Sequence, residues 1–261
     1  MTVRGTIGAT ERTPSIRRGP DRYEGESTAG RIRRTAAAVG ALFLLSNATF
    51  LLGAFAFVEP ILGAPDYLTL ASANRARMIV GALLELINGV AYLGIAVLVF
   101  PVLGQRFPSM ALWYVGFRVI EFVMQTLSDL SPLTLLTLSE DFLGTGGMEG
   151  ASFQAVGTLL QAQRYWAFQM VSITLALGAL SLYTMLYRSK LIPRFISVWG
   201  LVGATTVLTT TMLDIFALSV GPALGLVLGL PMLANELFLG VWLIVKGFNP
   251  SSTPSPAAEE P

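Results

Sequence analysis

Six polar or charged residues lie inside stretches that are otherwise apolar enough to cross a membrane. These candidate site residues are Glu85, Asn88, Arg118, Glu121, Asn235 and Glu236. Ionisable side chains are rare within membrane spans, and where they occur they line a path for a substrate or proton, or pair with one another. The residue types therefore indicate polar groups that tie the helices together or, as the alternative, a path that binds a small-molecule or proton ligand.

The spacing of these residues places them at similar depth. Glu85 and Asn88 are three residues apart, as are Arg118 and Glu121, so each pair shares one helix face. At about 1.5 Å of rise per residue, these four and Glu236 lie roughly 11 to 20 Å inward from the end of their span. A lone guanidinium at that depth costs at least about 2.5 kcal/mol. We therefore expect Arg118 to be the hub of a central layer, in contact with at least one of the three acids.

A second layer of charges is predicted nearer the outer ends of the spans. Asp129, Arg164 and Asp214 fall at similar depth there. We expect Arg164 to be held by Asp129 or by Asp214, because both acids lie at its level. In either layer the polar groups can also serve only to tie helices together, at about 1 kcal/mol or less for each interhelical hydrogen bond.

The elements that must position these residues are apolar helices. Hydrophobic residues make up 53% of the chain, charged residues only 13%, and the mean hydropathy is +0.65. In a soluble domain, roughly a quarter of all residues are charged. Six runs approach the roughly 20 residues that a hydrocarbon core requires, at residues 35–58, 78–100, 110–130, 166–187, 195–218 and 223–245. The sequence therefore predicts an all-α, polytopic membrane protein with a six-transmembrane-helix bundle.

Two outer loops have the pattern of short helical extensions. Asp66 fits the N-cap of a helix that runs through residues 67–71 into the second span. Glycines in the third loop precede a second helix over residues 152–163. Its predicted apolar face consists of Phe153, Val156, Leu159 and Leu160. The two extensions are expected either to form a small cap over the bundle or to lie at the lipid headgroups.

The segments outside the predicted membrane domain, which covers residues 35–248, are polar. Residues 1–34 contain eight Arg and few large apolar side chains, so we expect a disordered, Arg-rich cytoplasmic arm. This arm has almost no interleaved aromatic residues, so nucleic acid is not an expected partner. Residues 249–261 are predicted to form a disordered cytoplasmic tail. With six predicted spans, 13 of the 17 basic residues lie on the side of the membrane that holds the N-terminus, three lie on the other side, and Arg118 lies within a span. The positive-inside rule therefore places both termini in the cytoplasm and the bundle in a lipid bilayer.

Several chemistries are excluded by composition. The chain has no Cys and no His, so it has no thiolate or imidazole ligand and no His-activated nucleophile. We expect no metal, no cofactor and no catalytic residue. The two lysines lie at span edges, which leaves no candidate for a buried Ser-Lys dyad, and Asp129 and Asp214 lie too near the surface for an intramembrane aspartyl enzyme. The glycosylation sequon at residues 47–49 is inside a predicted span and is excluded as a modification site.

Small residues at regular spacing predict where helices pack closely. They are Gly200, Gly203 and Ala204 at the inner start of the fifth span, and Gly221, Gly225 and Gly229 at the outer end of the sixth span. A glycine at every fourth position gives a helix a flat face on which a neighbouring backbone can lie. We expect both stripes to be packing surfaces.

Longer motifs carry a family resemblance. The strings PDYLTLASANRARMIVGALLELINGV, LWYVGFRVIEF, LLTLSEDF, LYRSKLIPRFISVWGLVGA and LANELFLGVWLIVKGFNPS resemble the bacterial six-helix membrane family known as domain of unknown function 4386. The resemblance covers about residues 35–250 and implies a bacterial inner (plasma) membrane protein, with no established activity. At Arg164-Tyr165-Trp166 the family pattern more often has an acid in the middle position. If that acid pairs with the arginine, this chain must supply another partner.

Two functions remain from different classes. We favour a structural or accessory membrane subunit whose charges only fix the bundle. The alternative is a small carrier or ligand-binding membrane protein that uses Glu85, Arg118, Glu121 and Glu236. A cavity that reaches the central acids would favour the alternative, whereas a closed bundle with every charge paired would favour the structural role. An enzyme is the least favoured class.

Overall fold

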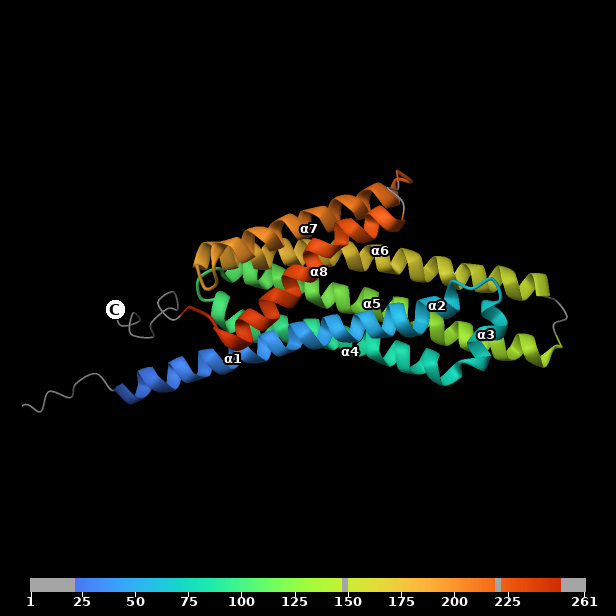
Figure 1. Cartoon of the computed structure of the whole chain (residues 1–261), viewed down its shortest axis with the longest axis horizontal. Helices are drawn as coiled ribbons and strands as arrows, with labels where there is room; N and C mark the ends of the chain where they lie inside the picture. Colours follow the sequence, from blue (N-terminus) through green and yellow to red (C-terminus); the bar gives the residue numbers. More distant parts are fainter. Residues whose placement is uncertain (1–21, 147–149, 219–221, 250–261) are drawn as a thin grey trace, which may run out of the picture.

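In the computed structural model, residues 22–146, 150–218 and 222–249 are described, and every regular element among them is a helix (Figure 1). This confirms the all-α prediction. The elements are α1 (Arg22–Phe50), η1 (Leu51–Val58), α2 (Glu59–Leu62), α3 (Tyr67–Ala73), α4 (Arg75–Leu103), α5 (Pro108–Gly144), α6 (Gly150–Ser189), α7 (Arg194–Ile215) and α8 (Pro222–Val245).

Five helical stretches are long and apolar enough to cross a membrane. They are Gly30–Leu62, Arg75–Leu103, Gly150–Ser189, Arg194–Ile215 and Val227–Val245. The span expected at residues 110–130 lies within α5, which is not one of these five. α5 is nevertheless a single helix of 37 residues, and its charged residues Arg118, Glu121 and Asp129 are all buried.

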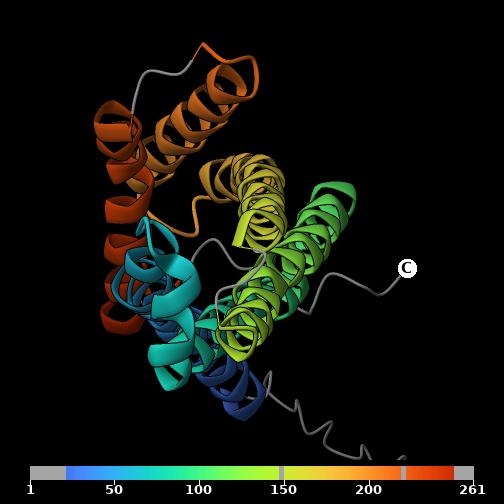
Figure 2. The ribbon, with the colours of Figure 1, turned by 90° about the vertical axis from the view of Figure 1, so that its right-hand side faces the viewer.

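The six long helices form a closed ring. Each packs against the next in the order α1, α4, α5, α6, α7, α8, and α8 returns to α1. Viewed from one end, α7 and α8 lie to one side of α1 and α6 (Figure 2). Glycines allow the closest approaches: a Cβ on Gly40 of α1 would lie 2.5 Å from the carbonyl oxygen of Gly240 on α8. This crossing brings the following turns of α1 beside Glu236.

The first helix begins earlier than expected. α1 starts at Arg22, so residues 22–34 are helical, whereas the sequence predicts a disordered arm up to residue 34. One reason for the extension is that Arg33 donates from Nη2 to the carbonyl oxygen of Val245 at 3.1 Å, which holds this part of α1 against the end of α8. Residues 1–21 and 250–261, on which the remaining arm and the tail predictions fall, lie outside the described residues.

A small cap covers the other end of the bundle (Figure 1). α2 and α3 pack against the far halves of α5 and α6 through a second apolar core, centred on Val58, Tyr67 and Leu135. Asp66 occupies the N-cap position of α3, but its side chain makes no capping hydrogen bond. α3 also ends before α4 starts, so it does not run into the second span as predicted.

The extension expected at residues 152–163 is the first part of α6, which continues unbroken through the bundle. Phe153 and Leu160 pack on the cap, with the buried Gly157 between them. Val156 and Leu159 are exposed, so the predicted face is only half right. The buried face follows the spacing 153, 157, 160, which continues to the charged residue Arg164.

Candidate functional site

Arg164 lies among acids from three neighbouring segments. Its Nε donates to Glu59 Oε1 at 2.9 Å, and its Nη2 donates to Glu85 Oε1 at 2.9 Å. Asp129 is farther away, with 3.9 Å between Oδ1 and Arg164 Nη1. Gln125 links two of these acids, since its Nε2 donates to Asp129 at 2.7 Å and to Glu85 at 3.3 Å. We call these five residues the Arg164 cluster.

The predicted partners of Arg164 need correction. Asp214 forms no ion pair with it, because Asp214 is on α7 while the ring places α2, α4 and α5 around the guanidinium. Glu85, expected in the central layer, belongs to the Arg164 cluster. Glu59 lies just beyond the first predicted apolar run, which ends at residue 58, so hydropathy gives no signal for it. The sequence has Tyr165 where an acid that could pair with Arg164 was expected, and Glu59 and Glu85 take the place of that acid. The Tyr165 hydroxyl accepts a hydrogen bond of 2.8 Å from Gln169.

Arg118 contacts one of its three predicted partners. Its Nη1 donates to both carboxylate oxygens of Glu121, at 2.9 and 2.8 Å, and both residues belong to α5. Neither Glu85 nor Glu236 forms an ion pair with it. Arg118 is therefore not a hub that ties spans together through ion pairs, because the partner it binds shares its helix face.

Two tyrosines cover the Arg118 guanidinium instead. Its central carbon lies 4.6 Å from the ring centroid of Tyr92 and 5.3 Å from that of Tyr114. Such cation–π contacts stabilise a buried cation without a second acid. The Tyr92 hydroxyl then donates to Glu236 Oε2 at 3.1 Å. Tyr92 thus joins Arg118 of α5 to Glu236 of α8, a role that hydropathy could not reveal.

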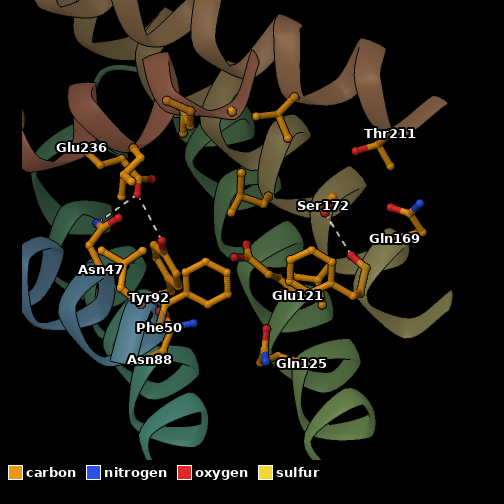
Figure 3. Close-up of a pocket in the computed structure, with 18 of the residues that line it drawn as sticks. Asn47, Phe50, Asn88, Tyr92, Glu121, Gln125, Gln169, Ser172, Thr211 and Glu236 are labelled. Atoms are coloured by element: carbon orange, nitrogen blue, oxygen red, sulfur yellow. Dashed lines mark hydrogen bonds between the residues drawn. The ribbon is translucent and has the colours of Figure 1, made fainter. Parts of the chain in front are cut away.

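Glu236 is a buried acid that forms no ion pair among the described residues. Its Oε2 accepts from Asn47 Nδ2 at 3.1 Å as well as from Tyr92 (Figure 3). Its Oε1 is buried and has no hydrogen-bond partner among the described residues. Asn47 was set aside as part of an unusable sequon, although an amide inside a span is itself a signal of a polar contact. We call Asn47, Tyr92, Arg118, Glu121 and Glu236 the central cluster.

The two predicted asparagines differ in use. Asn235 is buried, and its Nδ2 donates to the carbonyl oxygen of Ile196 at 2.9 Å, which joins α8 to α7. Asn88 is buried beside the central cluster, and its Oδ1 has no partner among the described residues. Asn235 therefore joins two helices and Asn88 lines the cavity, while the Oδ1 of each has no partner among the described residues.

A cavity of about 340 Å³ lies inside the ring, and all six long helices contribute to its wall. Glu121 and Glu236 reach it from two sides, and Asn88 and Gln125 lie below them in the close-up view (Figure 3). Asp214 also lines it, so this residue belongs to the cavity and not to the Arg164 cluster. No Lys or Arg is among the described residues of the wall, and most of the rest is apolar.

The glycines of α8 line this cavity. A Cβ placed on Gly225 or Gly229 would meet nothing within 4 Å, so the stripe predicted as a packing surface faces open space. Gly221 lies outside the described residues. Gly203 behaves as predicted, since a Cβ there would lie 2.9 Å from Met232 Cα. Closely spaced glycines therefore mark a tight contact on α7 and a cavity wall on α8.

Neither cluster has the donor set of a metal centre. Among the described residues, no group of three or more His, Cys, Asp or Glu side chains is arranged to hold a metal ion. The acids of the Arg164 cluster are occupied by a guanidinium. The arrangement in the central cluster is suited to binding, because it offers acids and amides on an otherwise apolar wall.

The fold and the site define an all-helical protein of membrane type with a ring of helices around a partly acidic cavity. The family model described as domain of unknown function (DUF4386) matches residues 38–247, and the chain belongs to this family. Comparison with curated proteins and with solved structures gives no match. The family description assigns no activity, so the function is argued from the site.

Proposed function

We propose that the protein is an integral membrane protein that binds a lipophilic cation in its central cavity. The observation that supports this most directly is the wall of the cavity, where Glu121, Asp214 and Glu236 are present and no Lys or Arg is found among the described residues. A ligand that complements such a wall has an apolar body and a positively charged group. Binding sites for small molecules typically combine a mainly apolar lining with a few polar groups in this way.

The balance of buried charge supports the same ligand class. Four acids are buried in the described bundle, namely Glu85, Glu121, Asp129 and Glu236, against two arginines, Arg118 and Arg164. Buried charges are stable only when they are paired or hydrogen-bonded. A bound cation would supply positive charge where the protein itself has an excess of acids.

The geometry favours this proposal over a purely structural role. A structural subunit requires a closed bundle in which every charge is paired. Every charge of the Arg164 cluster lies in an ion pair, whereas Glu236 of the central cluster lines the cavity and forms no ion pair among the described residues. The structural role thus falls to the Arg164 cluster and the binding role to the central cluster.

The proposal includes six spans, with α5 as the third. Between residues 112 and 130, its charged residues Arg118, Glu121 and Asp129 are buried, while the exposed large side chains are apolar. The exposed large apolar residues in its first half are Leu112, Trp113, Val119, Ile120, Val123, Leu127 and Leu130. A helix with this division can cross a bilayer, because only its buried side carries charge.

The proposed orientation places both termini in the cytoplasm of a bacterial cell. The chain has no Cys, so single cysteines can be introduced as reporters. We expect an impermeant thiol reagent to label Thr145→Cys in intact cells and to label Arg188→Cys only after permeabilisation. Both positions are exposed in the structure, at opposite ends of the bundle. The opposite pattern of labelling would reverse the orientation.

The binding proposal is tested with two ions of the same shape and opposite charge. Purified full-length protein in detergent is titrated with tetraphenylphosphonium or with tetraphenylborate, and binding is measured by calorimetry and by the shift in melting temperature. We expect the cation to bind and stabilise the protein. We expect Glu236→Gln to weaken binding at least tenfold, about 1.4 kcal/mol, because a charged contact is lost.

The matched control is Asp141→Asn, which removes an exposed acid of α5 far from the cavity. It should bind tetraphenylphosphonium like the parent. Gln at position 236 can still accept bonds from Asn47 and Tyr92, so the variant should fold. Equal binding of both ions, or unchanged binding by Glu236→Gln and Glu121→Gln, would show that the acids do not form a cation site.

A further inference from the structure

A second hollow lies at the end of the bundle where α6 ends, α7 begins and α8 ends. Its volume is about 480 Å³, and its wall includes Lys190, Arg194 and Lys246 beside Trp242 and Asn249. The three basic side chains are exposed. None of them forms an ion pair with an acid in the described part of the chain. The hollow therefore concentrates positive charge that the described protein does not neutralise.

The backbone around this hollow is fixed by two turns. Lys190 has a φ of 58° and Gly247 a φ of 72°, so each chain turns sharply where its helix ends. The amide of Asn249 donates to the carbonyl oxygen of Leu191 at 2.8 Å, which joins the two turns. α7 begins at Arg194, and its N-terminus adds the partial positive charge of a helix end. The cations thus project from a defined frame.

This whole end of the bundle is basic. The same end also carries Arg31, Arg33, Arg34, Arg106 and Arg188 (Figure 1). Within residues 30–249, the described acids nearest to it along their helices are Glu121 and Glu236, and both belong to the central cluster. Between residues 30 and 249, therefore, no described acid lies at the level of the hollow.

Aromatic residues mark the level of this end relative to a membrane. Phe238 lies between Phe195 and Trp242, with ring centroids 6.0 and 6.2 Å away, and Trp199 is at 5.9 Å. Phe195 and Phe238 are exposed on the outer side of α7 and α8. Aromatic side chains gather where the hydrocarbon core meets the headgroups. Trp242 belongs to this group and to the wall of the hollow, so an apolar surface leads directly into the cationic site.

We propose that the hollow binds the phosphate group of an anionic phospholipid, with the acyl chains against the aromatic group of α7 and α8. Phosphate is the chemistry that three convergent cations and a helix N-terminus recognise. A free phosphate ion shares this chemistry, but it has no apolar part that would contact the adjoining aromatic surface. The proposal does not depend on a ligand in the central cavity.

The test uses the full chain in detergent, titrated separately with phosphatidylglycerol, phosphatidylcholine and inorganic phosphate. Melting temperature reports stabilisation, and native mass spectrometry reports retained lipid. We expect phosphatidylglycerol alone to stabilise the protein and to remain bound. Each of Lys190→Gln, Arg194→Gln and Lys246→Gln should weaken that binding about fivefold, and the triple variant should retain no lipid.

Arg188→Gln is the matched control, since Arg188 is an exposed cation in the last turn of α6 that does not line the hollow. It should retain phosphatidylglycerol like the parent. A triple variant that melts like the parent without lipid is correctly folded. If Arg188→Gln weakens binding as much as the other variants, the lipid is attracted by the overall positive charge of this end, and the proposed site is wrong. If inorganic phosphate protects as well as the lipid, the assignment to a phospholipid is wrong.

Discussion

Arg164 and Arg118 are both buried, but the acids that bind them come from different parts of the fold. Arg164 of α6 is bonded by Glu59 of α2 and Glu85 of α4, so each of its short ion pairs joins two helical segments. Arg118 is bonded by Glu121 of its own helix. The first arrangement fixes helices relative to one another. The second neutralises a charge and leaves the facing helices free to surround a cavity.

This difference explains how one small bundle holds both a tightly bonded region and an open one. Bonds between helices add to stability because they are lost when the helices separate. Glu236, which no arginine pairs with, keeps one oxygen directed to the cavity. The central cluster is therefore the place for a ligand, and the Arg164 cluster is the part that keeps the ring closed around it.

The largest expected effect is the loss of Arg164. Arg164→Met leaves Glu59, Glu85 and Asp129 without their cation, and removing one partner of a buried pair costs about 3 to 5 kcal/mol. The free energy of unfolding is measured by denaturant titration in detergent. Arg164→Met combined with Glu85→Gln should recover only part of the loss, because two acids remain.

The central pair supplies the matched comparison. Arg118→Met alone should also destabilise, but Arg118→Met with Glu121→Gln removes both members of the only ion pair there and should recover most of the loss. The two double variants are measured in the same detergent. Equal recovery in both would mean that Arg164 also acts as a member of a simple pair, and the distinction between the clusters would be lost.

The sequence was sufficient to predict most of the long helices and the buried charged residues of the described bundle. Long apolar runs place helices reliably because a membrane leaves few other structures for the backbone. A charge inside such a run is equally conspicuous, and Glu85, Asn88, Arg118, Glu121, Asn235 and Glu236 are all buried in the structure. Depth along a helix, however, is only one of the coordinates that decide a contact.

The partners could not be predicted because rotation and neighbour order were unknown. One helical turn is about 5.4 Å, which is enough to change the side chains that a buried acid meets. The ring order decides that Asp214 faces the cavity and not Arg164. A tyrosine within an apolar run does not indicate a cation–π contact, so the role of Tyr92 could not be predicted. Asn47 was considered only as part of a glycosylation sequon, so its contact with Glu236 was not predicted.

Replacing glycine with alanine should give the next largest change in stability, with opposite signs at Gly203 and Gly229. Gly203→Ala should destabilise by about 1 to 3 kcal/mol, because its Cβ would lie 2.9 Å from Met232 Cα. Gly229→Ala should stabilise by up to about 1 kcal/mol, because the position is open and alanine favours a helix. Melting temperatures of the two variants in one detergent test this directly. A loss of stability in Gly229→Ala would mean that the α8 stripe packs against a neighbour, as the sequence suggests.

The smallest effect concerns Tyr92, whose ring and hydroxyl serve different partners. Tyr92→Phe keeps the ring over Arg118 and removes one of the two bonds to Glu236 Oε2. We expect a loss of about 1 kcal/mol in stability. Binding of tetraphenylphosphonium should strengthen by up to about fivefold, because an acid with one donor fewer attracts a cation more strongly.

Tyr114→Phe is the control for the Tyr92 experiment. The Tyr114 ring also covers Arg118, but its hydroxyl bonds no acid among the described residues and it does not line the cavity. It should leave tetraphenylphosphonium binding unchanged. If Tyr92→Phe lowers both stability and affinity, the hydroxyl shapes the cavity wall and does not compete with the cation for Glu236. Opposite changes would instead show that the protein uses part of the charge of Glu236 in its own hydrogen bonds, whereas the acids of the Arg164 cluster are held in ion pairs.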